Sequence, residues 1–441
     1  MRVLLIANNF DGFLDLALRA QDSGHQVKVF ARKYHPQTRP IGKGLVELVS
    51  DFRPWMRWSE LVLLEDNGVY MHEMERWRRE GCRIIGGNQD SALWELDRSL
   101  GMRIFRKAGI AIPPYREFND YDAAIAYVTS RDEPFASKPC GAVDDKSLSY
   151  IAKTPEDLLF MLRRWKSKHG KPPCPFILQE KVSGVEFAVG GWWGPGGWCE
   201  GWEENFEHKK LMPGDLGPNT GEMGTVMRYV RSSKLADQVL TPLESQLERL
   251  GYIGNVDVNC IVDEDGTAWP LEFTMRFGWP AFSIETALFD CDPIEFFSAL
   301  YEGESARGAH RLNEIAAGVV MVIPPFPHDP KNYDDVVGIP LTGEDDGWHA
   351  AELTGSPGRN GPGRSPSAQA PNSSRFWSAG SYLGIGVGVA SRTTAACKSA
   401  YASLTRIKMP ASPFWRNDIG KRLQKALPEL QRHGFARGLE Y

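Results

Sequence analysis

The 441-residue sequence has few of the features that mark secreted, zinc-bound or membrane-spanning proteins. Its seven cysteines are scattered without a CxxC pair, and its nine histidines show no HExxH or related spacing. A disulfide framework and structural zinc are therefore unexpected, and reduced, mostly buried thiols are the default. The longest apolar run, residues 315–323, is far shorter than the ~20 residues of a membrane helix. We expect a cytoplasmic protein.

A large charge of either sign is also missing. The chain has 51 basic and 56 acidic residues, which leave a formal net charge of -5. This balance provides no global basic field to attract nucleic acid or anionic lipid, so we expect small molecules as partners, without nucleic acid or membrane. The sequence leaves the oligomeric state open. A chain of this length allows two to four domains, at about 100 to 200 residues per domain.

The N-terminal region lacks the GxGxxG turn of dinucleotide-binding proteins, because residues 7–12 (ANNFDG) contain a single glycine. Its pattern nevertheless alternates between short buried strands and amphipathic helices. Strands are predicted over residues 2–7, 27–30, 61–64 and 83–85, and helices over 13–21 and 71–79. This alternation predicts a parallel α/β domain over residues 1–97.

A second domain is predicted from residue 98 to residue 312. A helix over 91–108 is ended by glycine and proline at 109–114. Beyond it, glycine- and proline-rich loops separate strands predicted over 135–139, 176–181, 186–192, 255–262 and 268–274. These features predict an α+β block with mainly antiparallel strands.

The remaining residues, 313–441, are predicted to form a small C-terminal α/β domain. Residues 354–374 are rich in Pro, Gly, Ser and Asn with almost no apolar content, which predicts a mobile loop. After it we expect a strand over 380–389, a helix over 393–406 and a helical segment over 415–433.

Two lysines of the central block have a spacing that suits phosphate binding. Lys138 ends a predicted strand, and Lys146 follows eight residues later beyond a glycine-containing loop. One lysine could hold nucleotide phosphates while the loop closes over them. Two surface lysines around a turn would give the same pattern.

A second segment runs from a strand into a turn. Extended backbone at Gln179, Glu180 and Lys181 could hydrogen-bond an adenine edge, and Glu186 could accept from ribose hydroxyls. An edge strand with solvated charges is an equally good interpretation. The segment 208–224 is longer and rich in glycine, with Asn, Thr, Asp and Met among the glycines, which favours a ligand-facing loop over a disordered linker.

The fourth segment predicts a β-hairpin. The strands at 255–262 and 267–273 are joined by the turn sequence DEDG, and an even-length turn there would place Asp257 opposite Glu272, and Asn255 opposite Thr274. Two facing carboxylates repel unless a cation lies between them, so magnesium coordination is predicted. Pairing of Glu272 with Arg276 or a lysine is the alternative.

Together these segments resemble the phosphoribosylamine–glycine ligase (glycinamide ribonucleotide synthetase) family of ATP-grasp enzymes. GDLGPNTGEMG at 214–224 is similar to that family's GDxGPNTGGMG, and LEFTMRFG at 271–278 is similar to LEFNARFG. His208 and Lys209 lie where the family has a His-Lys pair. RNDIG at 416–420 looks like the family's RxDIG. The likeness covers most of the chain in the right order.

The resemblance implies an N-terminal substrate domain, a two-lobed ATP-grasp domain and a small C-terminal domain. It implies a cytoplasmic ligase of purine biosynthesis that uses ATP with Mg²⁺ or Mn²⁺, glycine as the acid and phosphoribosylamine as the amine. The implied nucleotide contacts are Lys138 and Lys146 at the phosphates, Gln179, Glu180 and Lys181 at the adenine, Glu186 at the ribose, and Arg103 in place of a nucleotide-binding lysine.

The resemblance also implies a metal site and substrate sites. Glu272 is the implied magnesium ligand, with Asp257 and Thr274 beside it. Arg276 and Lys209 are expected to act in catalysis. The implied substrate-binding residues belong to the glycine-rich loop and are Asp215, Pro218, Asn219, Thr220 and Gly221.

Several positions depart from the family pattern. The family's glycine-rich GxGGREHA turn, which cradles the phosphate of phosphoribosylamine, is replaced by Asn-Asn-Phe-Asp-Gly, and Asp11 would repel a phosphate. Glu222 replaces the second glycine of GGMG, Thr274 replaces the asparagine of LEFN, and Trp279, directly before Pro280, replaces an acidic residue. Four tryptophans at 192, 193, 198 and 202 predict core packing or, alternatively, stacking on an aromatic substrate.

The predicted function is an ATP-dependent carboxylate–amine ligase that forms an amide through an acyl phosphate. The changed N-terminal turn makes a different amine acceptor an alternative within the same chemistry. A non-catalytic nucleotide-binding relative is the second alternative, because the change at Thr274 removes one expected metal ligand.

Overall fold

The structure is a computed structural model that describes residues 1–10, 12–35, 38–68, 70–141, 148–304, 308–343, 346–355 and 375–441. The predictions made for Asp11, for Lys146 and for nearly all of the proline- and glycine-rich loop fall outside these residues.

The N-terminal region forms the predicted parallel sheet, in the order β3-β2-β1-β4-β5. Its strands are β1 (Arg2–Ala7), β2 (Gln26–Ala31), β3 (Glu47–Leu48), β4 (Leu61–Leu64) and β5 (Ile84–Ile85). Val3 and Leu5 of β1 pack into one apolar cluster, and Leu4 and Ile6 pack into another. Both faces are therefore buried, as the continuous apolar pattern of these strands requires. Helices α1 (Leu14–Asp22) and α2 (Met71–Arg79) connect the strands, with a short helix η1 (Arg53–Trp55).

The single helix predicted over 91–108 is wrong. Two helices, α3 (Gln89–Leu96) and α4 (Arg98–Lys107), meet at Asp97, which has extended backbone angles. The Asp97 side chain accepts from the backbone N–H of Leu100 at 3.0 Å and so begins α4. The break matters because it places Arg98 at the start of a new helix.

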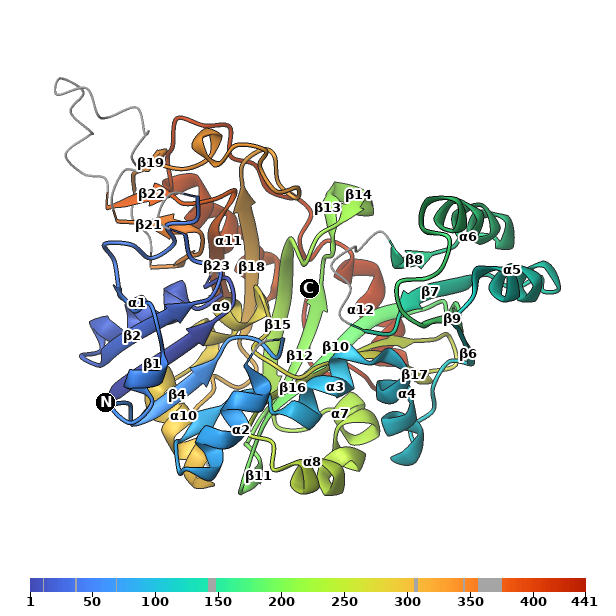
Figure 1. The fold of residues 1–441 in the computed structure, drawn as a ribbon, viewed down its shortest axis with the longest axis horizontal. Coiled ribbons are helices and arrows are strands. Elements are labelled where there is room, and N and C mark those ends of the chain that lie inside the picture. Colours follow the sequence, from blue (N-terminus) through green and yellow to red (C-terminus); the bar gives the residue numbers. More distant parts are fainter. Residues whose placement is uncertain are drawn as a thin grey trace.

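A small antiparallel sheet forms one lobe of the central block, in the order β6-β9-β7-β8. Its strands are β6 (Tyr115–Phe118), β7 (Phe135–Pro139), β8 (Tyr150–Ile151) and β9 (Phe176–Glu180). Helices α5 (Tyr121–Thr129) and α6 (Pro155–His169) lie beside it, away from the N-terminal sheet (Figure 1). Apolar residues of both helices and of β7 and β9 share a separate core cluster. This lobe therefore has its own core.

A nine-stranded sheet forms the centre of the molecule, in the order β17-β16-β10-β12-β15-β18-β23-β20, with β11 paired to β10. All its pairs are antiparallel, which confirms the predicted strand arrangement. Its strands are β10 (Val185–Gly194), β11 (Gly197–Trp198), β12 (Trp202–Glu207), β15 (Gly224–Val230), β16 (Gly254–Val262), β17 (Ala268–Thr274), β18 (Ile315–Val322), β20 (Trp348–Ala350) and β23 (Tyr382–Ala390). Strands on both sides of the predicted boundary at residue 312 join this one sheet, and the division into three domains stays a prediction.

Shorter elements surround the large sheet. They are the hairpin β13 (Lys210–Met212) and β14 (Leu216–Asn219) with η3 (Pro213–Asp215), the helices α7 (Lys234–Val239), η4 (Thr241–Leu243), α8 (Glu244–Leu250), α9 (Ala281–Glu285), η5 (Thr286–Leu288), α10 (Pro293–Glu302) and η6 (Tyr333–Asp335), and the strands β19 (Pro340–Leu341), β21 (Leu353–Thr354) and β22 (Phe376–Ser378). No helix in the described ranges is long and apolar enough to cross a membrane.

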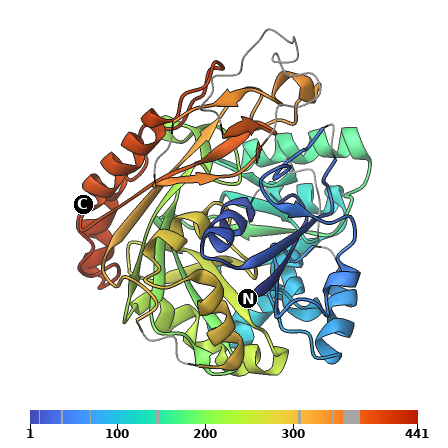
Figure 2. The same cartoon turned by 90° about the vertical axis from the view of Figure 1, so that its left-hand side faces the viewer.

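The C-terminal helices cover the outer face of the large sheet, opposite the N-terminal sheet (Figure 2). Helix α11 (Thr393–Arg406) coincides with the prediction. It approaches β23 closely, because a Cβ on Gly388 would lie 2.4 Å from the Ala396 carbonyl oxygen. The helix predicted over 415–433 is shorter in the structure, where α12 spans Leu423–Arg432. Gly420 before it has a φ of +78°, which is incompatible with a helix that continues through this position.

The predicted register of the β16–β17 hairpin is wrong. The turn holds five residues, 263–267, between the pair Val262 and Ala268, and the register shifts again after Asn259. As a result Asn259 lies opposite Glu272, and Asp257 lies opposite Thr274. A β-bulge causes such a shift by placing two residues of one strand against one of its partner.

Candidate functional site

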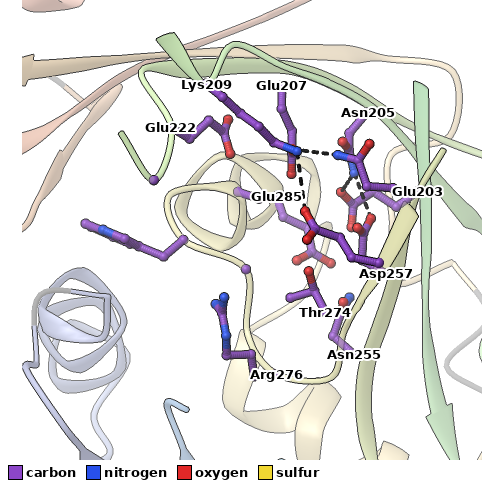
Figure 3. Close-up of a pocket in the computed structure, with 16 residues that line it drawn as sticks. Glu203, Asn205, Glu207, Lys209, Glu222, Asn255, Asp257, Thr274, Arg276 and Glu285 are labelled. Atoms are coloured by element: carbon purple, nitrogen blue, oxygen red, sulfur yellow. Dashed lines mark hydrogen bonds and ion pairs between the residues drawn. The ribbon is translucent and has the colours of Figure 1, made fainter. Parts of the chain in front are cut away.

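A cavity of about 150 Å³ lies on the inner face of the large sheet, beside α9 and the loop that follows β17 (Figure 3). Its polar lining comes from β12, β16, β17, α9, the glycine-rich loop and the loop after β17. The charged and amide residues that line it are Glu203, Asn205, Glu207, Lys209, Glu222, Asn255, Asp257, Asn259, Glu272, Arg276 and Glu285. Four residues predicted for metal or catalysis, Asp257, Thr274, Arg276 and Lys209, therefore share one cavity with Glu272.

Lys209 is the centre of an ion-pair network. Its Nζ lies 2.9 Å from Glu186 Oε1, 2.9 Å from Glu207 Oε2 and 3.7 Å from Glu272 Oε1. Burial alone would lower the pKa of Lys209, but the three carboxylates raise it well above its ordinary value. Lys209 is therefore a permanent cation, and Glu186, predicted to contact ribose, is held by it.

Glu272 is held on its other side by Arg98, a residue that the sequence analysis did not select. Arg98 Nη2 lies 2.6 Å from Glu272 Oε2. Burial opposes ionisation of Glu272, yet Arg98, Lys209 and Lys138 together lower its pKa far below the usual range. Arg103, predicted to contact nucleotide, lies exposed one and a half turns further along α4. The sequence signal that could have identified Arg98 is a basic residue directly after Asp97, the capping residue of α4.

Lys138 and Gln179 face one another across the pair β7–β9. Lys138 Nζ donates to Gln179 Oε1 at 3.4 Å, and Gln179 Nε2 contacts Met102 Sδ at 3.4 Å. Burial, followed by the charge of Arg98, lowers the pKa of Lys138 to about 8. Lys138 therefore remains mainly protonated at neutral pH.

The end of β9, where extended backbone was predicted to bind adenine, has fewer free backbone N–H donors than that prediction requires. The backbone N–H of Glu180 donates to Pro114 O at 2.8 Å, and that of Lys181 donates to Pro134 O at 3.0 Å. These two N–H groups are therefore already used within the lobe. The Lys181 side chain is exposed.

A second group of carboxylates also lines the cavity. Asn205 Nδ2 donates to both Glu203 Oε1 and Asp257 Oδ2, each at 3.0 Å. Burial and the neighbouring carboxylates raise the pKa of Glu203 and of Asp257 well above their ordinary values. Asp257 thus faces Asn205 and Glu203, whereas the predicted register had placed it opposite Glu272.

Glu285 of α9 is a further carboxyl group that lines the cavity. Trp192 Nε1 donates to Glu285 Oε1 at 2.6 Å, and the Tyr229 hydroxyl also donates to it. Burial raises the pKa of Glu285 to about 7. Trp192 is fully buried, which agrees with the predicted core packing. The rings of Trp193, Trp198 and Trp202 pack against one another beside a separate cavity.

The glycine-rich loop is fixed from outside the cavity by the RNDIG segment. Arg416 Nη1 donates to Asp215 Oδ1 and to Lys210 O, each at 2.9 Å. Asp418 Oδ2 accepts from the Gly214 N–H at 2.9 Å. Asp215 is therefore occupied by an arginine and lies away from the cavity.

The other loop residues predicted to bind substrate divide into three groups. Pro218 and Asn219 are exposed on β14. The Thr220 hydroxyl donates to Lys209 O at 3.0 Å, a contact within the loop. Gly221 lines the cavity together with Glu222. The structure therefore brings one of the five predicted loop residues to the cavity.

Arg276 lines the opposite wall and is fixed by Glu95. Its Nε donates to Glu95 Oε1 at 3.0 Å, and the second carboxylate oxygen accepts from the Met275 N–H at 2.9 Å. Glu95 raises the pKa of Arg276 further above its ordinary value. A fixed, charged guanidinium can bind a substrate carboxylate with its remaining N–H groups.

The turn after β1 is occupied by a carboxylate of the protein itself. Glu65, directly after β4, accepts from the backbone N–H groups of Asn8, Phe10 and Gly12 at 3.2, 3.3 and 3.0 Å. Glu65 is buried. The amides of this turn therefore already bind an anion.

Comparisons with known proteins support the resemblance noted in the sequence. Residues 97–282 match the model of the phosphoribosylglycinamide synthetase ATP-grasp (A) domain. The phosphoribosylamine–glycine ligase of Ralstonia nicotianae is 26% identical over 368 residues, covering 79% of this chain and 81% of that protein. The enzyme of the same name from Salmonella typhimurium is 23% identical over 363 residues, covering 79% and 80%.

Solved structures share the fold. The phosphoribosylamine–glycine ligase of Thermotoga maritima superposes with a TM-score of 0.72 at 16% identity, covering 95% of this chain and 100% of that chain. An ADP complex of N5-carboxyaminoimidazole ribonucleotide synthetase superposes with a TM-score of 0.59 at 13% identity, covering 91% and 96%. Residues 97–282 are therefore similar to an ATP-grasp domain, and most of the chain is similar to the phosphoribosylamine–glycine ligases in sequence and fold.

Proposed function

We propose that the protein is an ATP-dependent carboxylate–amine ligase of the phosphoribosylamine–glycine ligase type. The observation that carries this proposal is the convergence of three cations, Arg98, Lys138 and Lys209, on the carboxylate of Glu272. Lys138 comes from the small lobe and Arg98 from the neighbouring helix α4, whereas Glu272 lies on β17 of the large sheet and Lys209 in the loop after β12. Such a junction holds a transferring phosphoryl group by charge neutralisation and positioning.

Lys138 is the proposed contact to the nucleotide phosphates, and Gln179 lies beside it. Glu186, already fixed by Lys209, is the proposed acceptor for ribose hydroxyls. Because the N–H groups of Glu180 and Lys181 are used, an adenine at this strand end would be recognised by other backbone atoms of the segment. The roles predicted for Arg103 and Lys146 stay predictions.

The residues around Glu272 fit a magnesium or manganese ion that arrives with the nucleotide. Magnesium is usually held by one or two carboxylates together with substrate phosphates. Across the ladder from Glu272, the Asn259 side chain donates to Glu207, and within the described part of the chain its Oδ1 accepts no hydrogen bond. We propose Glu272 and Asn259 as the holders, with Thr274 nearby. When bound, the ion supplies charge neutralisation at the phosphates.

The chain's own residues then position two successive displacements. Arg276 orients the carboxylate of the acid substrate, glycine in the family default, so that a carboxylate oxygen attacks the γ-phosphorus and the bond to ADP breaks. The amine nitrogen next attacks the acyl carbon, the bond to phosphate breaks, and the nitrogen loses a proton. Glu285, with a pKa of about 7, and its neighbours are suited to receive that proton.

The test is an ADP-release assay with ATP, magnesium and glycine, in which phosphoribosylamine is generated in place and other amines are supplied in parallel. Amine-dependent ADP release is the expected result. ATP binding by calorimetry without ADP release from any amine would identify a non-catalytic nucleotide-binding relative instead. The cytoplasmic location and the purine-pathway role expected from the sequence stay predictions under this proposal.

A further inference from the structure

We infer that the amine acceptor is a small cationic amine without a phosphate group, bound among Glu203, Glu222, Asp257 and Glu285. We call these four residues the acidic cluster. The inference rests on the proposed ligase function, because it specifies the chemical class of that reaction's second substrate.

The first observation is an excess of carboxyl groups over cations in the cavity. Six carboxylates line it, whereas its lining contains two cations, Lys209 and Arg276. Lys209 is paired with Glu207 and Glu272, and Arg276 with Glu95, which lies outside the lining. In the residues that the structure describes, no member of the acidic cluster forms an ion pair. Buried carboxylates of this kind are normally paired.

The second observation concerns hydrogen bonds and is independent of the charge count. Asn205 and Glu222 are 2% and 4% exposed and line the cavity. Each has a buried oxygen, Asn205 Oδ1 and Glu222 Oε1, that accepts no hydrogen bond from any described residue. Unsatisfied buried acceptors are costly, so these oxygens call for a ligand that donates.

An organic ammonium group meets both requirements. It carries a positive charge and three donors without an acceptor. Burial and the surrounding carboxylates raise the pKa of Glu203 and Glu222 well above their ordinary values, and a bound cation reverses that shift. A cavity of about 150 Å³ accommodates a ligand of about six non-hydrogen atoms.

The third observation excludes the phosphate of the family's usual acceptor from its expected place. The backbone N–H groups of Asn8, Phe10 and Gly12 already donate to the Glu65 carboxylate. A phosphate there would have to displace a buried carboxylate or lie beside it, and the two anions repel one another. The turn therefore provides its own anion.

A metal ion is a weaker explanation of the acidic cluster. In the described ranges, no group of three or more His, Cys, Asp or Glu side chains is arranged to hold a metal. We therefore assign the cluster to an organic amine.

The test is calorimetry on the full chain with MgADP present. The probes are straight-chain diamines of two to five carbons, and the matched pair ethanolamine and O-phosphoethanolamine. We expect at least one diamine to bind, and ethanolamine to bind more tightly than its phosphorylated counterpart. No binding by any diamine, or tighter binding of O-phosphoethanolamine, would overturn the inference. Displacement of a bound diamine by magnesium alone at equal concentration would identify a metal site instead.

Two isosteric variants connect the binding to the cluster. Glu222→Gln should weaken binding of the best diamine by about tenfold to a hundredfold, because it removes one charge without changing shape. Glu264→Gln, at an exposed position of the β16–β17 turn, is the matched control and should leave the affinity unchanged. Equal affinity in wild type and Glu222→Gln would remove the cluster from the site.

The ADP-release assay separates failure of this inference from failure of the ligase proposal. Turnover with phosphoribosylamine that exceeds turnover with every diamine leaves the ligase proposal standing and overturns the inference. Diamine binding that Glu222→Gln abolishes, with no ADP release from any amine, supports the binding site and overturns the ligase proposal. A Glu65→Ala variant adds a third measurement, since freeing the turn amides should create binding of inorganic phosphate that the wild type lacks.

Discussion

Asn259 lies directly opposite Glu272 in the β16–β17 ladder, at the place where the sequence predicted Asp257. Asn259 also donates to Glu207, and Glu207 in turn pairs with Lys209. The amide is therefore oriented by the same network that holds Lys209. This relationship changes which residues should determine the metal requirement.

The first prediction concerns magnesium. Asn259→Ala should raise the half-saturating magnesium concentration of ADP release by about 10- to 100-fold, because it removes an oxygen beside Glu272. Asp257→Asn should leave that concentration unchanged, since Asp257 faces Asn205 and Glu203. The measurement is ADP release against free magnesium at saturating ATP. A shift in Asp257→Asn without one in Asn259→Ala would support the hairpin register that the sequence predicted.

Glu272→Ala should remove magnesium-dependent turnover. In the predicted register, facing Asp257, this change would relieve repulsion. In the structure Glu272 is paired with Arg98 and Lys209, so its removal leaves two cations with less compensation. We expect a small loss of thermal stability, measured by calorimetric unfolding, together with a fall in turnover of about a hundredfold or more. Undiminished turnover at limiting magnesium would exclude Glu272 from the metal site.

The second prediction concerns the nucleotide. Lys138→Ala should weaken ATP binding by about ten- to a hundredfold, the effect of losing one charge-assisted hydrogen bond in a partly desolvated site. The pKa of Lys138, lowered to about 8, means that its charge is present at pH 7 and is lost as the pH rises through 8. Wild-type ATP affinity, measured by calorimetry, should therefore fall above pH 8.

Lys138→Arg supplies the control, because arginine stays protonated throughout this range. Its ATP affinity should vary less between pH 7 and pH 9 than that of the wild type. An equal decline in both proteins would show that another group causes the pH dependence. Wild-type affinity in Lys138→Ala would show that Lys138 does not contact nucleotide.

Individual elements could be predicted from the sequence wherever a local pattern alone determines them. Strands β1, β4, β7 and β17 and helices α2 and α11 have the predicted bounds, because the spacing of apolar residues along each segment decides which face is buried. The glycine-rich loop and the LEFTMRFG segment were recognised by motif. Both contribute to the cavity, through Gly221, Glu222, Glu272 and Arg276.

Relationships between distant segments could not be predicted in the same way. The register of β16 and β17 depends on a bulge after Asn259, which the turn sequence does not reveal. Glu65 binds the turn after β1 from a different strand, more than fifty residues away. The four carboxyl groups of the acidic cluster come from β12, β16, α9 and the glycine-rich loop. Their proximity cannot be predicted from local sequence patterns, because only the folded chain brings them to one cavity.

The third prediction concerns acid stability. Burial, together with Arg422 and Arg416, lowers the pKa of His208 to about 3, whereas an unfolded histidine titrates near 6.5. The unfolded chain therefore takes up a proton at His208 below pH 6.5 and the folded chain does not. The stability contribution of the neutral ring is present above pH 6.5 and is lost as the pH falls toward 3, at about 1.4 kcal/mol per pH unit.

His208→Gln isolates this effect, since glutamine still offers an acceptor for the Gly420 N–H that His208 Nε2 accepts at 3.2 Å. Urea unfolding at pH 7 and pH 5 is the measurement. The wild type should lose about 2 kcal/mol more stability than the variant between these two values. Equal losses would show that His208 is accessible to protons in the folded chain.

The last prediction concerns the RNDIG segment, whose arginine acts on the glycine-rich loop from outside the cavity. Arg416 is 1% exposed, forms two hydrogen bonds to Asp418 at 2.8 Å, and donates to Asp215 and Lys210. Arg416→Ala removes the link between the two segments and leaves the carboxylates without their cation.

Hydrogen exchange of residues 210–219 should therefore accelerate more in Arg416→Ala than exchange elsewhere in the large sheet. The KM for the substrates should rise, because the loop that carries Gly221 and Glu222 is no longer fixed. Lys421→Ala, an exposed neighbour, is the control and should change neither measurement. Uniform acceleration across the sheet with an unchanged KM would mean that Arg416 contributes to overall stability without positioning the loop.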